Sequence, residues 1–130
     1  MTVRVDISLL LASARIGVGV LLVAAPTVVL PREAAGNGTN ALLMRTVGIR
    51  DLVLGGGAVV ARTRGRRDEF RRWASAGLAS DTGDLLAGIC SARLVGRSGA
   101  IKAVAVVAPW VAAGVAGLAG PRPRGDSVLL

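Results

Sequence analysis

Three aspartates and two arginines lie inside stretches that are otherwise apolar enough to cross a lipid bilayer. They are Arg15, Arg50, Asp51, Asp81 and Asp84. A charged side chain at the centre of a bilayer costs at least about 2.5 kcal/mol, so we expect the five to face one another or a wet cavity. Carboxyl groups beside an arginine in a low dielectric suit proton transfer, which makes Asp51, Asp81 and Asp84 candidate catalytic residues. The alternative is that the charges only fix which helix packs where.

Glycines and alanines flank these charges at the spacing of a helix face. Residues three or four positions apart lie on one stripe of an α-helix. The stripes are Ala12, Arg15 and Gly19, then Gly48, Asp51 and Gly55, and finally Gly77, Asp81, Asp84 and Gly88. Arg50 lies about 100 degrees around its helix from Asp51, so that helix should present acid and base to different neighbours. The pattern predicts three helices whose backbones close around a shared polar centre.

Four apolar segments must position these side chains, and each is long enough to cross a bilayer as a helix. We predict transmembrane helices over residues 8–30, 41–61, 71–92 and 99–120. Residues 93–98 should form a loop, and residues 121–130 a short cytoplasmic tail. The predicted fold class is therefore all-α, a polytopic membrane protein with one four-helix transmembrane domain over residues 1–130.

Proline, capping residues and glycine mark the boundaries and contacts of these helices. Pro31 cannot continue the first helix, and Thr39 or Asn40 should cap the second. Asp68 should cap the third helix. The glycine run Gly55–Gly57 inside the second helix predicts a groove that receives a neighbouring helix.

The fourth segment brings no charge to the polar centre. Pro109 should bend it, and Trp110 should either pack on lipid or cover the charged residues. We therefore group Trp110 with Arg15 and Arg50 as candidate residues of a charge network or ligand-binding site. Trp73, one turn inside the third segment, suits an anchor at the membrane interface.

Composition places the chain among membrane proteins and argues against a nucleic-acid partner. The 130 residues are 52% hydrophobic, and the mean hydropathy is +0.60. A net charge of +8 would suggest nucleic acid for a soluble protein. The densest arginine cluster, however, falls between two apolar segments, over residues 62–72. The positive-inside rule then predicts a cytoplasmic turn, two cytoplasmic termini and anionic lipid headgroups as counter-ions.

The usual metal and haem ligands are missing from the sequence. It contains one cysteine, Cys90, and no histidine, so zinc, copper and haem ligand sets of the common kinds cannot be assembled. We predict no cofactor and no metal site, and we read Cys90 as a small apolar residue.

Several motifs resemble those of a family of small four-helix membrane proteins common in actinobacteria, domain of unknown function 4267. They are the run Arg45–Gly55, with Gly-x-Arg-Asp-x-x-x-Gly inside it, the run Arg71–Gly77, and Asp81-Thr82-Gly83-Asp84. The resemblance covers residues 12–92 and implies the four-helix topology and a bacterial inner membrane. It implies no activity and no catalytic residue.

These observations leave three functions open. The first is a non-enzymatic membrane protein whose polar centre sets helix packing and binds a lipophilic small molecule or a partner helix. The second is a membrane-embedded acid–base enzyme, an isomerase or an epoxide-opening enzyme, acting on a lipid-soluble substrate. The third is a proton-coupled or small-solute passage. A homo-oligomer through Ala113-x-x-x-Gly117 or Ala116-x-x-x-Gly120 is a further expectation.

Overall fold

The computed structural model describes residues 6–120 and is helical throughout, with no strand in that range. This confirms the all-α prediction. The helices are α1 (Ile7–Ala24), α2 (Pro26–Val29), α3 (Arg32–Ala35), α4 (Gly38–Thr63), α5 (Arg67–Cys90) and α6 (Ala92–Ala119). The predicted tail at residues 121–130 lies outside the described residues, and so do both termini.

The first helix ends earlier than predicted. Asp6 caps α1, because its carboxylate accepts a hydrogen bond from the backbone N–H of Leu9 at 3.2 Å. The helix stops at Ala24, since Pro26 has no N–H to continue it and instead opens the short helix α2. The prediction of one helix over residues 8–30 was wrong because it placed the stop at Pro31 instead of Pro26.

The caps of α4 and α5 also differ from the prediction. Asn37 caps α4 by accepting a hydrogen bond from the N–H of Thr39 at 2.9 Å, so neither Thr39 nor Asn40 is the cap. Arg66 precedes α5 without a side-chain cap, and Asp68 lies inside the first turn. There its negative charge still favours the positive end of the helix dipole.

The predicted loop at residues 93–98 is reduced to a single break. Helix α6 begins at Ala92, and only Gly96 leaves the helical conformation, with φ of 76° and ψ of 164°. A positive φ of this size is open to glycine and strained for other residues. Beyond the break, α6 continues past Pro109 to Ala119.

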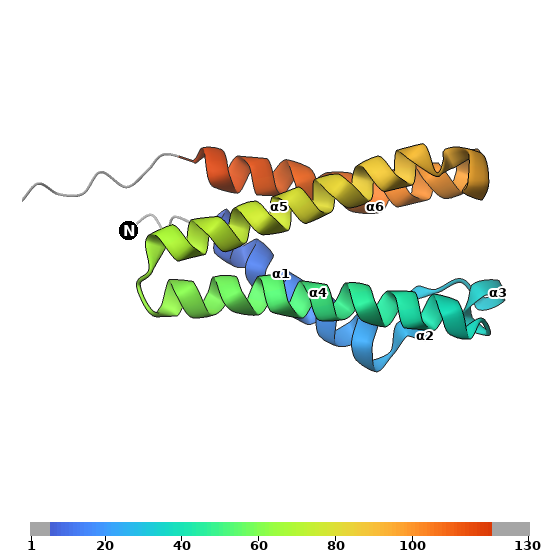
Figure 1. Cartoon of the computed structure of the whole chain (residues 1–130), viewed down its shortest axis with the longest axis horizontal. Helices are drawn as coiled ribbons and strands as arrows, with labels where there is room; N and C mark the ends of the chain where they lie inside the picture. The colour runs from blue at the N-terminus through green and yellow to red at the C-terminus, as the bar shows by residue number, and fades with distance from the viewer. Residues whose placement is uncertain (1–5, 121–130) are drawn as a thin grey trace, which may run out of the picture.

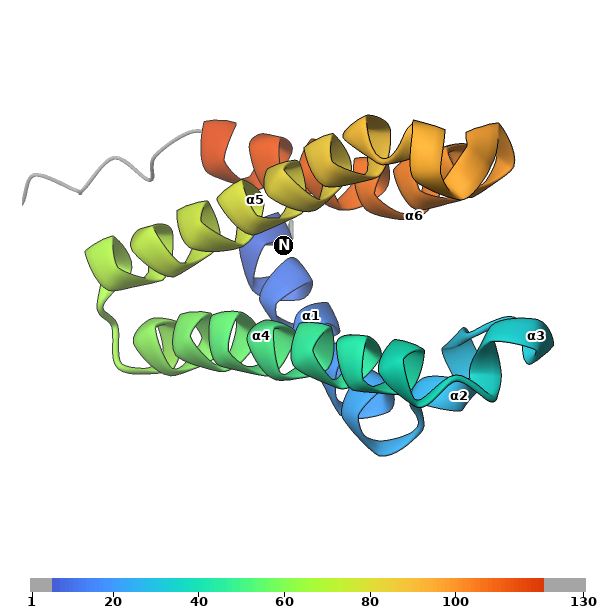
Figure 2. The ribbon, with the colours of Figure 1, turned by 45° about the vertical axis from the view of Figure 1, so that its right-hand side comes forward.

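The long helices form two pairs that diverge like the arms of a V. Helix α1 packs mainly against α4, and α5 packs mainly against α6. The turn between α4 and α5 joins the arms at one end, and the arms separate toward the end that carries α3 (Figures 1 and 2). Helix α1 crosses obliquely, from the α5/α6 arm at its start to the α4 arm at its end (Figure 2).

Glycines set the closest approaches between helices. A Cβ built on Gly48 of α4 would lie 2.8 Å from the carbonyl oxygen of Gly19 on α1, so the two backbones touch there. The glycine run receives two neighbours, as predicted. Gly55 accommodates the backbone of Ala12, and Gly57 accommodates the indole of Trp73 from α5. Trp73 is half-buried against this run. Its role as an interfacial anchor stays a prediction.

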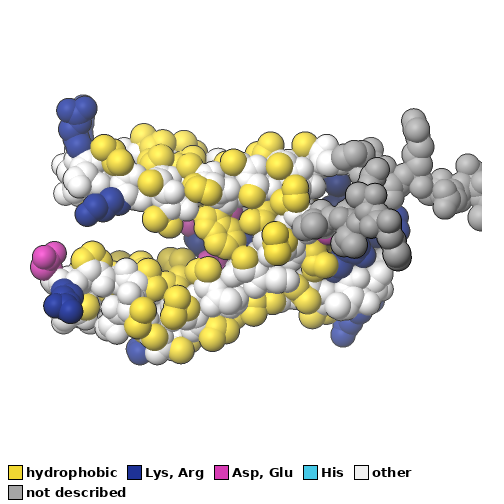
Figure 3. Space-filling model, turned by 180° about the vertical axis from the view of Figure 1, so that it is seen from behind, with side chains coloured by type: hydrophobic (Ala, Val, Ile, Leu, Met, Phe, Trp, Pro, Cys, Tyr) yellow, Lys and Arg dark blue, Asp and Glu magenta, His cyan; other side chains and the backbone are white. Residues whose placement is uncertain are grey.

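Within residues 6–120, the buried apolar core is thin and the apolar surface is wide. The buried apolar side chains are Ala12, Leu22, Ala58, Ala61, Phe70 and Ala100. Many larger side chains are exposed, among them Leu10, Leu42, Leu86 and Ile101. Figure 3 shows apolar side chains along the flanks and arginine or lysine side chains gathered mainly toward the two ends.

Two of the described helices, α1 and α6, are long and apolar enough to cross a membrane. Their mean hydropathies are 2.2 and 1.8 over the best windows, and none of that window of α6 is buried inside the structure. Helices α4 and α5 are long enough but more highly charged, so by length and composition only two of the four predicted spans are candidates for crossing a membrane.

Candidate functional site

The side chain of Arg15 lies at the middle of α1 and contacts all three of the other long helices. Its Nη1 donates to Oδ1 of Asp51 on α4 at 3.1 Å, and its Nη2 donates to Oδ2 of Asp81 on α5. Its guanidinium carbon also lies 5.5 Å from the ring centroid of Trp110 on α6, within the range of a cation–π contact. One cation therefore connects four helices.

A glycine gives Arg15 the space that it occupies. A Cβ on Gly77 of α5 would lie 3.2 Å from Nε and from Nη2 of Arg15, so the guanidinium rests against bare backbone. Gly77 was predicted to lie on the stripe with Asp81, and both residues are buried on one face of α5. A larger residue at position 77 would push the guanidinium away from Asp81.

Arg50 forms the second junction of the site, between α4 and α5. Its Nη1 donates to Oδ1 of Asp84 at 2.9 Å, and its Nη2 lies 2.8 Å from Oδ2 of the same carboxylate. This two-pronged geometry is the strongest form of an arginine–carboxylate pair. Nη2 also lies 3.5 Å from Oδ1 of Asp51, whereas Nε is buried and has no hydrogen-bond partner.

All five predicted charges therefore join in one chain of alternating sign. The order is Asp81, Arg15, Asp51, Arg50, Asp84. The helical offset between Arg50 and Asp51 has the predicted consequence, because Asp51 meets α1 while Arg50 meets α5. Asp81 pairs with Arg15, which also pairs with Asp51, and Asp84 pairs with Arg50.

The two ends of this chain differ in their access to the surroundings. The side chains of Arg15, Asp51 and Asp81 are 9%, 10% and 8% exposed. Those of Arg50 and Asp84 are 32% and 40% exposed. The Asp81 end is therefore enclosed, and the Asp84 end is open.

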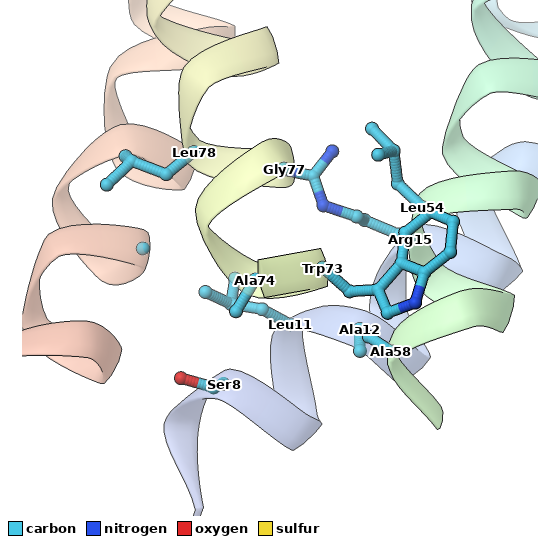
Figure 4. Close-up of a pocket in the computed structure, with 11 residues that line it drawn as sticks. Ser8, Leu11, Ala12, Arg15, Leu54, Ala58, Trp73, Ala74, Gly77 and Leu78 are labelled. Carbon is cyan, nitrogen blue, oxygen red and sulfur yellow. The ribbon is translucent and has the colours of Figure 1, made fainter. Parts of the chain in front are cut away.

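A small cavity adjoins the enclosed end (Figure 4). It measures about 20 Å³, and its wall includes Arg15, Trp73, Gly77, Ser8 and Gly114. Figure 4 shows the guanidinium of Arg15 extending toward Gly77, with the indole of Trp73 between α5 and α4. A space of this size holds about one water molecule. It is too small for an organic substrate to reach Asp51 or Asp81.

Three contributors to the site were not predicted from the sequence. Trp73 forms part of the cavity wall, and Ser8 of α1 packs against Gly117 of α6, where an added Cβ would lie 2.5 Å from the Ser8 Oγ. A useful signal was the spacing of Ser8 from Ala12, which extends the buried stripe of α1 by one turn. Gly117, which belongs to the first predicted dimer motif, faces α1 within the same chain. In the second predicted motif, Ala116 and Gly120 are both exposed.

Among the described residues, no three aspartate, glutamate or cysteine side chains gather where they would hold a metal ion. The arginines occupy the positions beside Asp51, Asp81 and Asp84 that a cation would need.

Comparisons of the chain with family models, with curated proteins and with solved structures give no match. The resemblance to domain of unknown function 4267 therefore stays a prediction.

Proposed function

We propose that the chain is a small multi-pass membrane protein in which α1, α4, α5 and α6 each span the bilayer and the charged network holds them together. Its activity is then the binding of a lipophilic molecule or a partner helix, and not catalysis. The observation that carries this proposal is the contact of the Arg15 guanidinium with residues of all three other long helices.

The distribution of apolar surface supports a lipid environment. A water-soluble domain gains most of its stability by burying large apolar side chains. Here the buried apolar residues are mainly alanines, whereas Leu10, Leu42, Val53 and Ile101 are more than half exposed. In lipid this surface needs no cover, and helices associate instead through small residues and polar contacts. The glycine contacts and the ion pairs are contacts of that type.

The lengths and charges of the helices agree with four spans. Helices α4, α5 and α6 have 26, 24 and 28 residues. At 1.5 Å per residue, α4 and α5 are about 39 and 36 Å long and the part of α6 after the break at Gly96 is about 35 Å long, more than the roughly 30 Å of a hydrocarbon core. Helix α1 has 18 residues and is about 27 Å long, at the lower end of the roughly 17 to 25 residues that span a bilayer. The charges in the middle of α4 and α5 neutralise one another in the network, so their cost in lipid falls. The remaining charges of α5 lie in its first two turns.

The candidate catalytic aspartates are enclosed or bonded to arginine, and this favours binding over catalysis. Asp51 and Asp81 are enclosed and bonded to Arg15, and the adjoining cavity is no larger than about one water. A general acid or base must come within hydrogen-bond reach of its substrate. Only Asp84 is open enough for such contact, and Arg50 holds it by two bonds.

Labelling of engineered cysteines tests the proposed topology. In a Cys90→Ala background, Thr63→Cys places a thiol at the turn between α4 and α5, and Ser98→Cys places one near the other end of the molecule. With the arginine-rich turn in the cytoplasm, a membrane-impermeant maleimide should label the Ser98 variant in intact cells and the Thr63 variant only after permeabilisation. Equal labelling of both from one side would refute four spans.

A further inference from the structure

Three basic side chains gather at the turn between α5 and α6. Arg93, Arg97 and Lys102 are all exposed, and among the described residues the ion pairs include none of the three. The sequence has no acidic residue between Asp84 and Asp126, so no neighbour in the chain supplies a counter-charge. This turn lies at the end of the molecule opposite the arginine-rich turn (Figure 1), which is the outer end in the proposed topology. The positive-inside rule makes such a group of cations unusual there.

An apolar groove adjoins these cations. It is lined by Ile89, Ala92, Ala100, Ile101, Val104 and Ala105. It measures about 340 Å³, against about 20 Å³ for the cavity beside Arg15. Ile89 and Ile101 are 51% and 67% exposed, so the groove is open to the surroundings. A groove of this size and lining accommodates an alkyl chain, whereas the smaller cavity holds about one water.

The cations and the groove follow one another along the same face of α6. Arg97, Ile101 and Ala105 are spaced by four residues and therefore form one stripe. Lys102 borders this stripe, about 60 degrees around the helix from Ala105. The break at Gly96 also starts a new helical stretch at Arg97, and the start of a helix favours negative charge. Positive charge at the turn is thus followed by an apolar surface farther along the helix.

We propose that this groove binds an anionic phospholipid, with its headgroup phosphate against Arg97 and Lys102 and one acyl chain along Ile101 and Ala105. The order of charge and apolar surface along α6 matches the order of phosphate and acyl chain in such a lipid. The anionic class follows from the cations, because a zwitterionic lipid brings a positive charge of its own to a site that already has three. The inference rests on the proposed membrane location of the bundle, in which the groove faces lipid.

Cys90 provides a local reporter for this groove, because it is the only cysteine, is exposed and directly follows Ile89. The full chain is labelled there with bimane and reconstituted in bilayers that contain phosphatidylglycerol or phosphatidylcholine with the same brominated acyl chains. Bromine quenches only a fluorophore close to it, so lipids at the arginine-rich turn do not contribute. Each cation near a membrane surface adds about fivefold to the affinity for an anionic lipid. We therefore expect phosphatidylglycerol to bind at least about tenfold more tightly than phosphatidylcholine.

Two kinds of variant separate the contribution of charge from that of the groove. Arg97→Gln and Lys102→Gln should each lower the preference for phosphatidylglycerol about fivefold. Arg32→Gln is the matched control, because it removes an exposed arginine of α3 at the same end of the molecule, away from the α5/α6 arm (Figure 1). It should leave the preference unchanged. Ala105→Leu keeps every charge but fills the groove and should lose most of the binding, whereas Ala112→Leu, at an exposed position of α6 outside the groove, should keep it.

Three results would overturn the proposal. The first is equal quenching by the two lipids in the folded wild type. The second is an unchanged preference in both Arg97→Gln and Lys102→Gln. The third is unchanged binding of phosphatidylglycerol in Ala105→Leu, which would mean that the groove takes no part.

A second copy of the chain is the rival occupant of the groove. Ile101→Cys in a Cys90→Ala background tests it by disulfide cross-linking in the same bilayers. Phosphatidylglycerol should lower the yield of cross-linked dimer, and a high yield that it does not lower would assign the groove to a second copy and overturn the proposal. Any of these failures in a protein whose Thr63 and Ser98 variants label from opposite sides would leave the four-span proposal standing.

Discussion

Replacement of Arg15 by methionine is the most direct test of the network as the element that holds the helices together. Methionine has an unbranched apolar side chain like the stem of arginine, but it is shorter and carries no charge. The substitution leaves Asp81, whose side chain is 8% exposed, without its arginine, whereas Asp51 keeps Arg50 at 3.5 Å. Removing one partner of a buried ion pair costs about 3 to 5 kcal/mol. Since a domain of this size has about 5 to 15 kcal/mol of stability in all, Arg15→Met should lose a large part of it.

Thermal unfolding of the purified protein in detergent measures this loss. A cost of 3 to 5 kcal/mol should lower the Tm by roughly 10 to 20 °C. The triple variant Arg15→Met, Asp51→Asn, Asp81→Asn replaces the orphaned charges by neutral groups and should recover at least about half of that shift. Arg45→Met is the matched control, because Arg45 is an exposed arginine of α4 whose Nε donates only to the carbonyl of Val23. It should change the Tm by less than about 2 °C.

Two results would refute this reasoning. A Tm for Arg15→Met within about 2 °C of the wild type would mean that the network contributes little to stability. A triple variant no more stable than Arg15→Met would mean that the orphaned carboxylates are not the cause of the loss.

The other substitutions test the depth of the network and the closeness of the helices. Asp81→Asn should destabilise the protein by about 1 to 3 kcal/mol and Asp84→Asn by less than about 1 kcal/mol, because the first side chain is enclosed and the second is 40% exposed. Thermal unfolding in detergent compares them, and equal losses would contradict the difference in burial. Gly48→Ala should cost about 1 to 3 kcal/mol, since the new Cβ would lie 2.8 Å from the Gly19 carbonyl, whereas Gly56→Ala meets nothing within 4 Å and should cost nothing. Equal unfolding temperatures for these two variants would show that α1 and α4 do not touch at Gly48.

The sequence was enough to predict the helical class and the faces that meet. Charges flanked by small residues every three or four positions form a local signal, so the buried stripe through Gly48, Asp51 and Gly55 could be read directly. The different neighbours of Arg50 and Asp51 follow from one helical step of about 100 degrees. Neither inference needs the relative height or tilt of the helices.

The pairing within the network and the end of α1 could not be predicted in the same way. Whether Asp81 or Asp84 meets Arg15 depends on how far α5 is shifted along α1, which no local pattern encodes. Pro26 and Pro31 are both candidates for a helix stop, and the chain bends at the first one. The contact of the Trp73 indole with the bare backbone at Gly57 depends on how α5 is placed against α4, which the sequence of neither helix encodes.

In the proposed membrane bundle, glycine contacts and ion pairs determine different features of how the helices pack. Small residues let two helices approach, but they discriminate weakly between one register and the next, because lipid and helix surfaces are almost equally apolar. A shift of α1 by one turn, about 5.4 Å, would separate Arg15 from both Asp51 and Asp81. A similar shift between α4 and α5 would break both bonds from Arg50 to Asp84. The charges therefore fix the register that the glycines leave open, which gives a physical reason for five charged side chains in the middle of otherwise apolar helix segments.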